Sequence, residues 1–306
     1  IAMYVKRPFG EKLNASFDFL KENWKLLLKF ITYLLLPLCL IQALSLNGLM
    51  SGALSISAIA SSTAMAASSS SLIAFGSYYG LYMFLYLIGI ILLTSLVYGL
   101  IRTYNEREER LQGVTLGMLK PRLFRNIKRL LLMTGACILL VLFVGIFVGL
   151  LVALTPFTLF LTIPFIIAFS VPLALLAPIY LFEDITLMEA FKKTFRLGFA
   201  TWGGVFLVSL LMGIIANVLQ GVTMMPWYIG TVVKYFFAMS DVGGSGEVTV
   251  SAGYSFFLYL MAIIQTFGAY LAMIFTFVGM AYQYGHASEV VDSITVETDI
   301  DNFDKL

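Results

Sequence analysis

Charged residues are missing from four long stretches of this chain. Asp, Glu, Lys and Arg do not occur at all within 30–101, 130–182, 197–233 and 248–288. A charged side chain at the middle of a bilayer costs several kcal/mol, and a membrane-spanning helix needs roughly 20 apolar residues. The lengths of these stretches therefore predict six spans, near 26–46, 77–101, 130–154, 157–181, 201–224 and 254–284.

The composition agrees with this pattern. The chain has 306 residues, of which 60% are hydrophobic and 12% charged, and its mean hydropathy is +0.94. Soluble globular proteins carry about a quarter charged residues, so the composition excludes a soluble globule and also a disordered chain. We predict an all-α integral membrane protein with a single polytopic domain over 1–284, followed by an acidic tail over 285–306.

The distribution of basic residues predicts the topology. Lys and Arg cluster within 6–29, 102–129 and 192–196, all on one side of a six-span arrangement, whereas Lys234 alone lies on the other side. Because cytoplasmic flanks carry the excess of Lys and Arg, both termini are predicted to be cytoplasmic. The first span is expected to be an anchor, since no small-residue cleavage site follows it.

A short amphipathic segment precedes each pair of spans, which predicts an internal repeat. In the first segment Leu13, Phe17, Leu20 and Trp24 recur at helical spacing, and in the middle one Leu123 and Ile127 do so after Pro121, which is expected in the first turn of a new helix. The third segment has the stripe Leu187, Phe191 and Phe195. We predict three repeats of an interfacial helix plus two spans, over about 9–101, 113–182 and 184–284.

The third segment also has a well-marked start. Thr186 and Glu189 have the spacing of a capping box, in which the two side chains bond each other's backbone N–H groups. Glu183 and Asp184 lie just ahead of that start, where carboxylates complement the helix dipole. A proton-coupling or cation site is the alternative interpretation of this acidic pair.

The basic residues of the second and third segments are candidate contacts for anionic lipid headgroups, at about 1 kcal/mol each near a membrane surface. They are Lys120, Arg122, Arg125, Lys128, Arg129, Lys192, Lys193 and Arg196. Nucleic acid is not expected as a partner, because Glu106, Glu108 and Glu109 would repel phosphates and no nucleic-acid-binding motif surrounds the basic residues.

A resemblance to a known family appears at residues 178–198. The run from Pro178 to Gly198, PIYLFEDITLMEAFKKTFRLG, resembles the recurring element of bacterial inner-membrane families related to the membrane region of glycerophosphodiester phosphodiesterases. It has Thr194-Phe195 where that element usually has Ser-Trp. The resemblance implies a multi-helix domain in the bacterial inner membrane with interfacial elbows. It implies no activity, because the phosphodiester chemistry belongs to a separate soluble domain.

The residues available for catalysis predict a protein that is not an enzyme. His286 is the one histidine in the sequence, so a histidine-rich metal site cannot be built within one chain, and no cofactor is expected. The Gly243–Gly246 run does not precede a Lys and a helix, so it fails as a phosphate loop.

Four amides inside the spans have two possible roles. Gln42, Asn217, Gln220 and Gln265 all lie in the outer half of the predicted topology. They would either line an outward-facing polar cavity or join helices through hydrogen bonds. The first role would suit a small-solute or lipid transporter.

Other features bear on packing and partners. Pro156, Pro164, Pro172 and Pro178 should segment the fourth span, because each removes a backbone donor. Gly145 and Gly149 offer a close-approach face for a helix pair, including a homodimer. In the tail, Ile294, Val296 and Ile300 alternate with polar residues, and an extended segment that adds to the sheet edge of a partner protein is one hypothesis.

Two functions remain open from the sequence. The preferred one is a non-enzymatic accessory or scaffold protein that interacts with lipids, and the alternative is the transporter with an outward-facing polar cavity. The absence of charged residues inside the spans disfavours ion-coupled transport.

Overall fold

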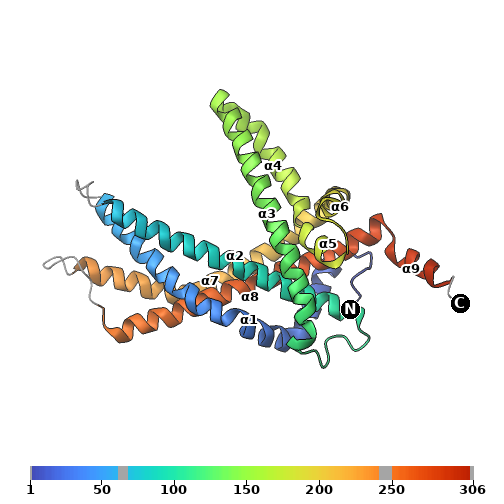
Figure 1. Cartoon of the computed structure of the whole chain (residues 1–306), viewed down its shortest axis with the longest axis horizontal. Coiled ribbons are helices and arrows are strands. Elements are labelled where there is room, and N and C mark those ends of the chain that lie inside the picture. The colour runs from blue at the N-terminus through green and yellow to red at the C-terminus, as the bar shows by residue number, and fades with distance from the viewer. Residues whose placement is uncertain (1, 61–67, 241–249, 304–306) are drawn as a thin grey trace. The chain divides into compact units, whose positions relative to one another are not determined.

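The computed structural model describes residues 2–60, 68–240 and 250–303, which form helices and the turns and loops that connect them (Figure 1). The elements, in chain order, are α1 (Phe9–Ala60), α2 (Ser68–Glu106), α3 (Leu116–Leu154), the short 3₁₀ helix η2 (Pro156–Thr158), α4 (Leu159–Leu173), α5 (Leu176–Phe182), α6 (Leu187–Ala200), α7 (Trp202–Ser240), α8 (Ala252–Val291) and α9 (Ile294–Phe303). The predicted all-α class is confirmed for these residues.

Six helical stretches in the described part of the chain are long and apolar enough to cross a membrane. They are Phe9–Ala53, Leu72–Glu106, Leu116–Leu154, Pro156–Phe182, Trp202–Phe237 and Ala252–Val291. Each overlaps one of the six predicted spans, so the number and the order of the spans are confirmed. The chain is a multi-pass helical membrane protein.

Only the third of the three predicted interfacial segments is a helix of its own in the described residues. The first is the beginning of α1, and the second is the beginning of α3, which starts at Leu116 with Thr115 as its N-cap. Pro121 therefore lies inside α3, and the prediction of a new helix at Pro121 was wrong. The reason is the cap: the Thr115 side chain accepts from the backbone N–H of Met118 at 3.3 Å and starts the helix earlier.

The fourth span is segmented as its prolines predict. Thr155 is extended and reverses the chain between α3 and η2, with its N–H bonded to Leu151 O at 3.1 Å and its Oγ1 accepting from Phe157 N at 3.4 Å. α4 then contains Pro164 and Pro172 and ends at Leu173, and α5 follows after a two-residue break. Proline has no backbone N–H and its ring clashes with the carbonyl of the residue four positions earlier; for Pro178 that residue is Ala174, which lies in the break.

The helices form two compact units. Unit 1 comprises residues 1–28, 94–214 and 274–306, and unit 2 comprises residues 29–93 and 215–273. These boundaries cut across those of the three predicted repeats, and the repeats stay a prediction.

Unit 1 has an aromatic core. The rings of Phe19 and Tyr104 meet edge to face at 5.1 Å between centroids, and those of Tyr98 and Phe182 do so at 5.3 Å. Phe182 also packs on Tyr284, at 5.6 Å. Edge-to-face contacts of this kind add about 0.5–1.5 kcal/mol to the burial of the rings, so α1, α2, α5 and α8 are joined here.

Unit 2 is packed around Trp227. Ala43, Leu46 and Ala262 are buried with it, and its indole N–H donates to Asn47 Oδ1 at 2.9 Å. This bond satisfies the polar end of a side chain that is otherwise in apolar surroundings. It links α1 to α7 within unit 2.

Replacing Gly198 by alanine should destabilise unit 1 by about 1–3 kcal/mol. A Cβ atom at this position of α6 would lie 2.7 Å from the Cα atom of Pro172 in α4, and backbone cannot move aside cheaply. The matched control is Gly135→Ala in α3, where no described atom lies within 4 Å of the added Cβ. Thermal unfolding of both variants in a neutral detergent, followed by circular dichroism, checks the prediction, and equal melting temperatures would contradict it.

Candidate functional site

The C-terminal end of α5 is held by arginine side chains. α5 ends at Phe182, so its last carbonyl groups have no partners within the helix. Arg129 of α3 bonds three carbonyls: its Nε donates to Tyr180 O at 2.9 Å, and its Nη2 donates to Glu183 O at 3.2 Å and to Ile185 O at 2.6 Å. Its guanidinium group also lies 3.8 Å from the centroid of the Tyr180 ring.

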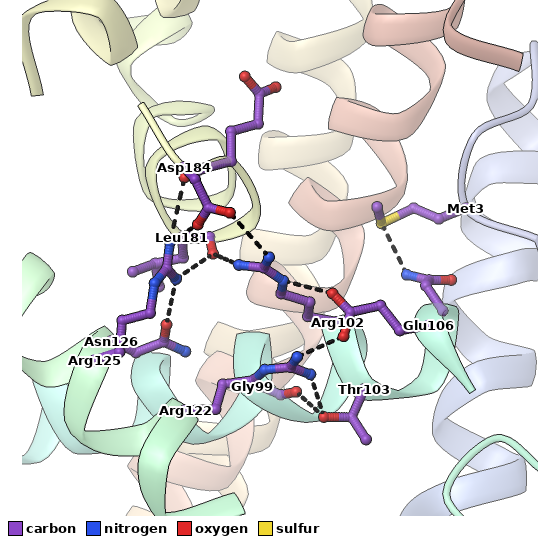
Figure 2. Close-up of polar contacts among 12 residues, drawn as sticks. Met3, Gly99, Arg102, Thr103, Glu106, Arg122, Arg125, Asn126, Leu181 and Asp184 are labelled. Carbon is purple, nitrogen blue, oxygen red and sulfur yellow. Dashed lines mark hydrogen bonds and ion pairs between the residues drawn. The ribbon is translucent and has the colours of Figure 1, made fainter. Parts of the chain in front are cut away.

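Two further arginines converge on the next carbonyl (Figure 2). Arg102 Nη1 and Arg125 Nη1 donate to Leu181 O at 3.3 and 3.2 Å, and both guanidinium groups pair with the Asp184 carboxylate. Positive charge at a helix C-terminus also interacts favourably with the helix dipole. Arginines from α2 and α3 thus fix the end of α5 and the loop that follows it.

Arg122 extends the network along α2. Its Nη1 donates to Thr103 Oγ1 at 2.7 Å, and its Nη2 pairs with the Glu106 carboxylate. Glu106 is shared, since Arg102 Nε donates to its other oxygen at 2.8 Å (Figure 2). Three guanidinium groups and two carboxylates are therefore linked in one chain of ion pairs, which we call the arginine network (Arg102, Arg122, Arg125, Glu106 and Asp184).

A second group of charges joins α6 to the end of α8. Glu183 accepts a bond from the Tyr284 hydroxyl at 2.5 Å and pairs with Lys193 Nζ at 2.7 Å. Asp292 pairs with Lys193 at 3.6 Å and with Arg196 at 2.8 Å. The tail segment after α8 is thereby tied to α6 within unit 1.

The two acidic residues ahead of α6, Glu183 and Asp184, are therefore both bonded to groups of the protein itself. The capping box predicted at Thr186 and Glu189 is confirmed: Thr186 N donates to Glu189 Oε2 at 2.9 Å, and Glu189 N donates to Thr186 Oγ1 at 3.3 Å. These bonds hold the pKa of Glu189 below its usual value. Burial alone would raise the pKa of Asp184, but the charges of Arg102, Arg125 and Arg129 outweigh it and keep that pKa low.

The predicted lipid-contact residues divide into two groups. Arg122, Arg125, Arg129, Lys193 and Arg196 are all bonded to acceptors of the protein itself. Lys120, Lys128 and Lys192 are exposed, and none of the three forms an ion pair within the part of the chain that the structure describes. The number of basic residues in the sequence could not separate these groups, because Arg129, for example, is bonded to backbone carbonyls more than 50 residues away.

The four candidate cavity amides all belong to unit 2. Gln42 is fully buried, and its Oε1 accepts from the Tyr270 hydroxyl at 2.5 Å. Asn217 is exposed, and Gln220 and Gln265 are partly exposed. The bond of Gln42 joins α1 to α8, which is the helix-joining role, and the polar cavity stays a prediction.

The hypothesis of an extended tail segment at Ile294, Val296 and Ile300 was wrong, because these residues lie in the helix α9. Glu289 starts this helix: its carboxylate accepts from Thr295 N at 3.1 Å and from the Thr295 hydroxyl at 2.5 Å. Capping of the first turn favours helix over strand. His286 is likewise engaged, since its Nδ1 accepts from the backbone N–H of Arg7 at 3.0 Å.

A cavity of about 560 Å³ opens beside the arginine network. It is lined by Arg102, Thr103, Glu106, Arg107, Val114, Met118, Leu119, Pro121, Arg122, Arg125 and Asp184. Of its charged residues, Arg102 and Arg107 were not among the candidates from sequence. Their position just after a charge-free stretch, ahead of a second basic segment, is the pattern that could have indicated them.

Replacing Arg129 by lysine should destabilise the protein by about 1–3 kcal/mol, although the charge is kept. A single ammonium group cannot reach the three carbonyls that the guanidinium group bonds or stack on Tyr180 in the same way. Lys128→Ala, at the exposed neighbouring position, is the control and should change stability by no more than about 0.5 kcal/mol. The same thermal unfolding assay decides, and a stable Arg129→Lys variant would contradict the assigned role.

Asp184 should contribute to stability in a pH-dependent way. Its pKa is lower in the folded protein, so its contribution is fully present above the unfolded value of about 3.9 and is lost as pH falls through the folded value. At pH 6 the free energy of unfolding of the wild type should therefore exceed that of Asp184→Asn, by at most about 1 kcal/mol because the carboxylate is exposed. The difference should begin to narrow as pH falls below about 4, and a difference that widens in acid would contradict the assignment.

Comparison with protein-family models, with curated proteins and with solved structures finds no match to this chain. The likeness of residues 178–198 to the membrane region of glycerophosphodiester phosphodiesterases stays a prediction. The arrangement of charged and apolar side chains in unit 1 is therefore what bears on function.

Proposed function

We propose that this chain is a non-enzymatic accessory protein of the bacterial inner membrane that gathers anionic lipids at the cytoplasmic surface. The observation that carries the proposal is the set of exposed lysines, Lys120, Lys128 and Lys192, in unit 1. Their ammonium groups are available to ligands, whereas the neighbouring arginines are bonded to the protein.

The surroundings of these lysines suit a membrane surface. Phe124 is 53% exposed, and the Lys120 ammonium lies 5.9 Å from the centroid of its ring. Leu131 and Leu132, on the next turns of α3, are more than half exposed as well. Exposed apolar side chains beside lysines are typical of helices at the headgroup level, where the ring and the aliphatic parts enter the acyl region and the charge meets phosphate.

α6 supports the same function from a second helix. It is capped at Thr186 and packs against α4 and α5, while Lys192 and Met188 are exposed on it. The arginine bonds at the end of α5 fix the loop from which α6 starts. The lysines are thus presented from two helices whose relative placement is set within one unit.

The composition of the lipids that stay bound to the protein tests the proposal. Wild type and a Lys120→Gln, Lys128→Gln, Lys192→Gln variant are reconstituted in nanodiscs of mixed phosphatidylglycerol and phosphatidylcholine, and the bound lipids are quantified by mass spectrometry. Wild type should be enriched in phosphatidylglycerol, and each lost lysine should reduce the preference by about fivefold, the equivalent of about 1 kcal/mol.

Lys234→Gln is the matched control, because Lys234 lies in unit 2 and on the opposite side in the predicted topology. It should leave the enrichment unchanged. Equal enrichment in wild type and in the triple variant would overturn the proposal.

A further inference from the structure

The cavity beside the arginine network has a surplus of positive charge. Four guanidinium groups and two carboxylates line it, so the lining carries a net charge of +2. The carboxylates are the more exposed partners: the side chains of Glu106 and Asp184 are 46% and 74% exposed, against 20–31% for the four arginines. The fixed part of the lining is therefore cationic.

Three of the four arginines are bonded to neutral groups in addition to the two carboxylates. Arg102 and Arg125 are bonded to Leu181 O, and Arg122 is bonded to the hydroxyl of Thr103 (Figure 2). These neutral acceptors position the guanidinium groups without cancelling their charge. A site that is already arranged for an anion loses less free energy to ordering when the anion binds.

Arg107 adds a fourth guanidinium group to the same lining. Its Nη2 is bonded to Glu109 at 3.0 Å and to Gln112 O at 3.2 Å. Its Nη1 is buried and has no hydrogen-bond partner among the described residues. Because this nitrogen is closed off from solvent, Arg107 contributes to the cavity through its positive charge.

The rest of the lining is apolar. Val114 and Leu119 are 5% and 4% exposed, and Pro121 and Met118 complete this side of the cavity. A volume of about 560 Å³ falls in the range of small-molecule sites, roughly 300–1,000 Å³. The cavity therefore suits an anion that carries an organic group.

We propose that this cavity is a binding site for a phosphate monoester dianion, whose phosphate group takes the surplus charge of the arginines and whose organic part lies on Val114, Met118 and Leu119. Guanidinium forks match phosphate oxygens in geometry, and a dianion matches the net charge of the lining. The phosphate is that of a lipid headgroup such as phosphatidic acid or that of a soluble phosphate compound. The site uses none of the exposed lysines, so it stands apart from the proposed function.

Purified full-length protein in a neutral detergent tests the proposal, with inorganic phosphate as the soluble probe and phosphatidic acid in mixed micelles as the lipid probe. Chloride at equal ionic strength and phosphatidylcholine micelles are the respective controls. Either phosphate probe should raise the melting temperature of the wild type above its control. A rise with phosphatidic acid alone assigns the lipid source, and a rise with inorganic phosphate assigns a source that includes soluble phosphates.

Two variants make the result specific to the cavity. Arg107→Gln removes one positive charge from the lining and should weaken binding by about tenfold or more. Met118→Glu adds a negative charge to the lining and should also weaken binding, and it keeps the fold because Met118 is exposed at the third position of α3. Met188→Glu, at an exposed methionine of α6 outside the lining, is its matched control and should bind as wild type does.

The proposal is overturned if neither phosphate probe stabilises the wild type, or if Met118→Glu binds as tightly as Met188→Glu. Loss of lipid enrichment in the triple lysine variant, with phosphate binding retained, would leave this site standing and support the proposed function separately. Enrichment that the triple lysine variant loses, with no phosphate binding by the wild type, would overturn this site alone.

Discussion

The bonds from guanidinium groups to the backbone carbonyls at the end of α5 are the interaction on which unit 1 depends. A short helix of seven residues, Leu176–Phe182, has too few internal hydrogen bonds to be stable by itself. Arg102, Arg125 and Arg129 donate hydrogen bonds to its terminal carbonyls from two other helices. Because hydrogen bonds to charged groups contribute about 1.5–3 kcal/mol each, they set where α5 ends, and so where the loop to α6 and the cavity beside it are placed.

This arrangement explains why the arginines and the lysines of unit 1 have different roles. Arg129 bonds three carbonyls with one planar group, which an ammonium group cannot do. Lys120 and Lys128 occupy the same stretch of α3 and extend into the surroundings instead. The same basic segment of α3 thus contains an arginine that bonds within unit 1 and lysines that are exposed.

The sequence predicts what depends on local pattern and on the cost of charge in a bilayer. The six spans follow from charge-free stretches, and the capping box at Thr186 and Glu189 follows from a three-residue spacing. The carbonyl groups that Arg125 and Arg129 bond lie more than 50 residues away, and because every residue has a carbonyl group, no pattern of side chains identifies them. α9 was missed for a related reason: Val296 and Ile300 fit an alternating strand and one face of a helix equally well, and the cap on Thr295 that decides between them comes from Glu289.

The reversal at Thr155 has a consequence for how the chain enters the membrane. Its backbone N–H and hydroxyl oxygen are bonded within the turn, and the Thr158 hydroxyl donates to Thr155 O at 2.8 Å. No charged residue lies anywhere between Arg129 and Glu183. The connection between α3 and α4 can therefore cross the bilayer with these polar groups of its turn already bonded, and no charge has to move through the hydrocarbon. The energy barrier to translocating this connection is low, and the two spans can insert together as a helical hairpin.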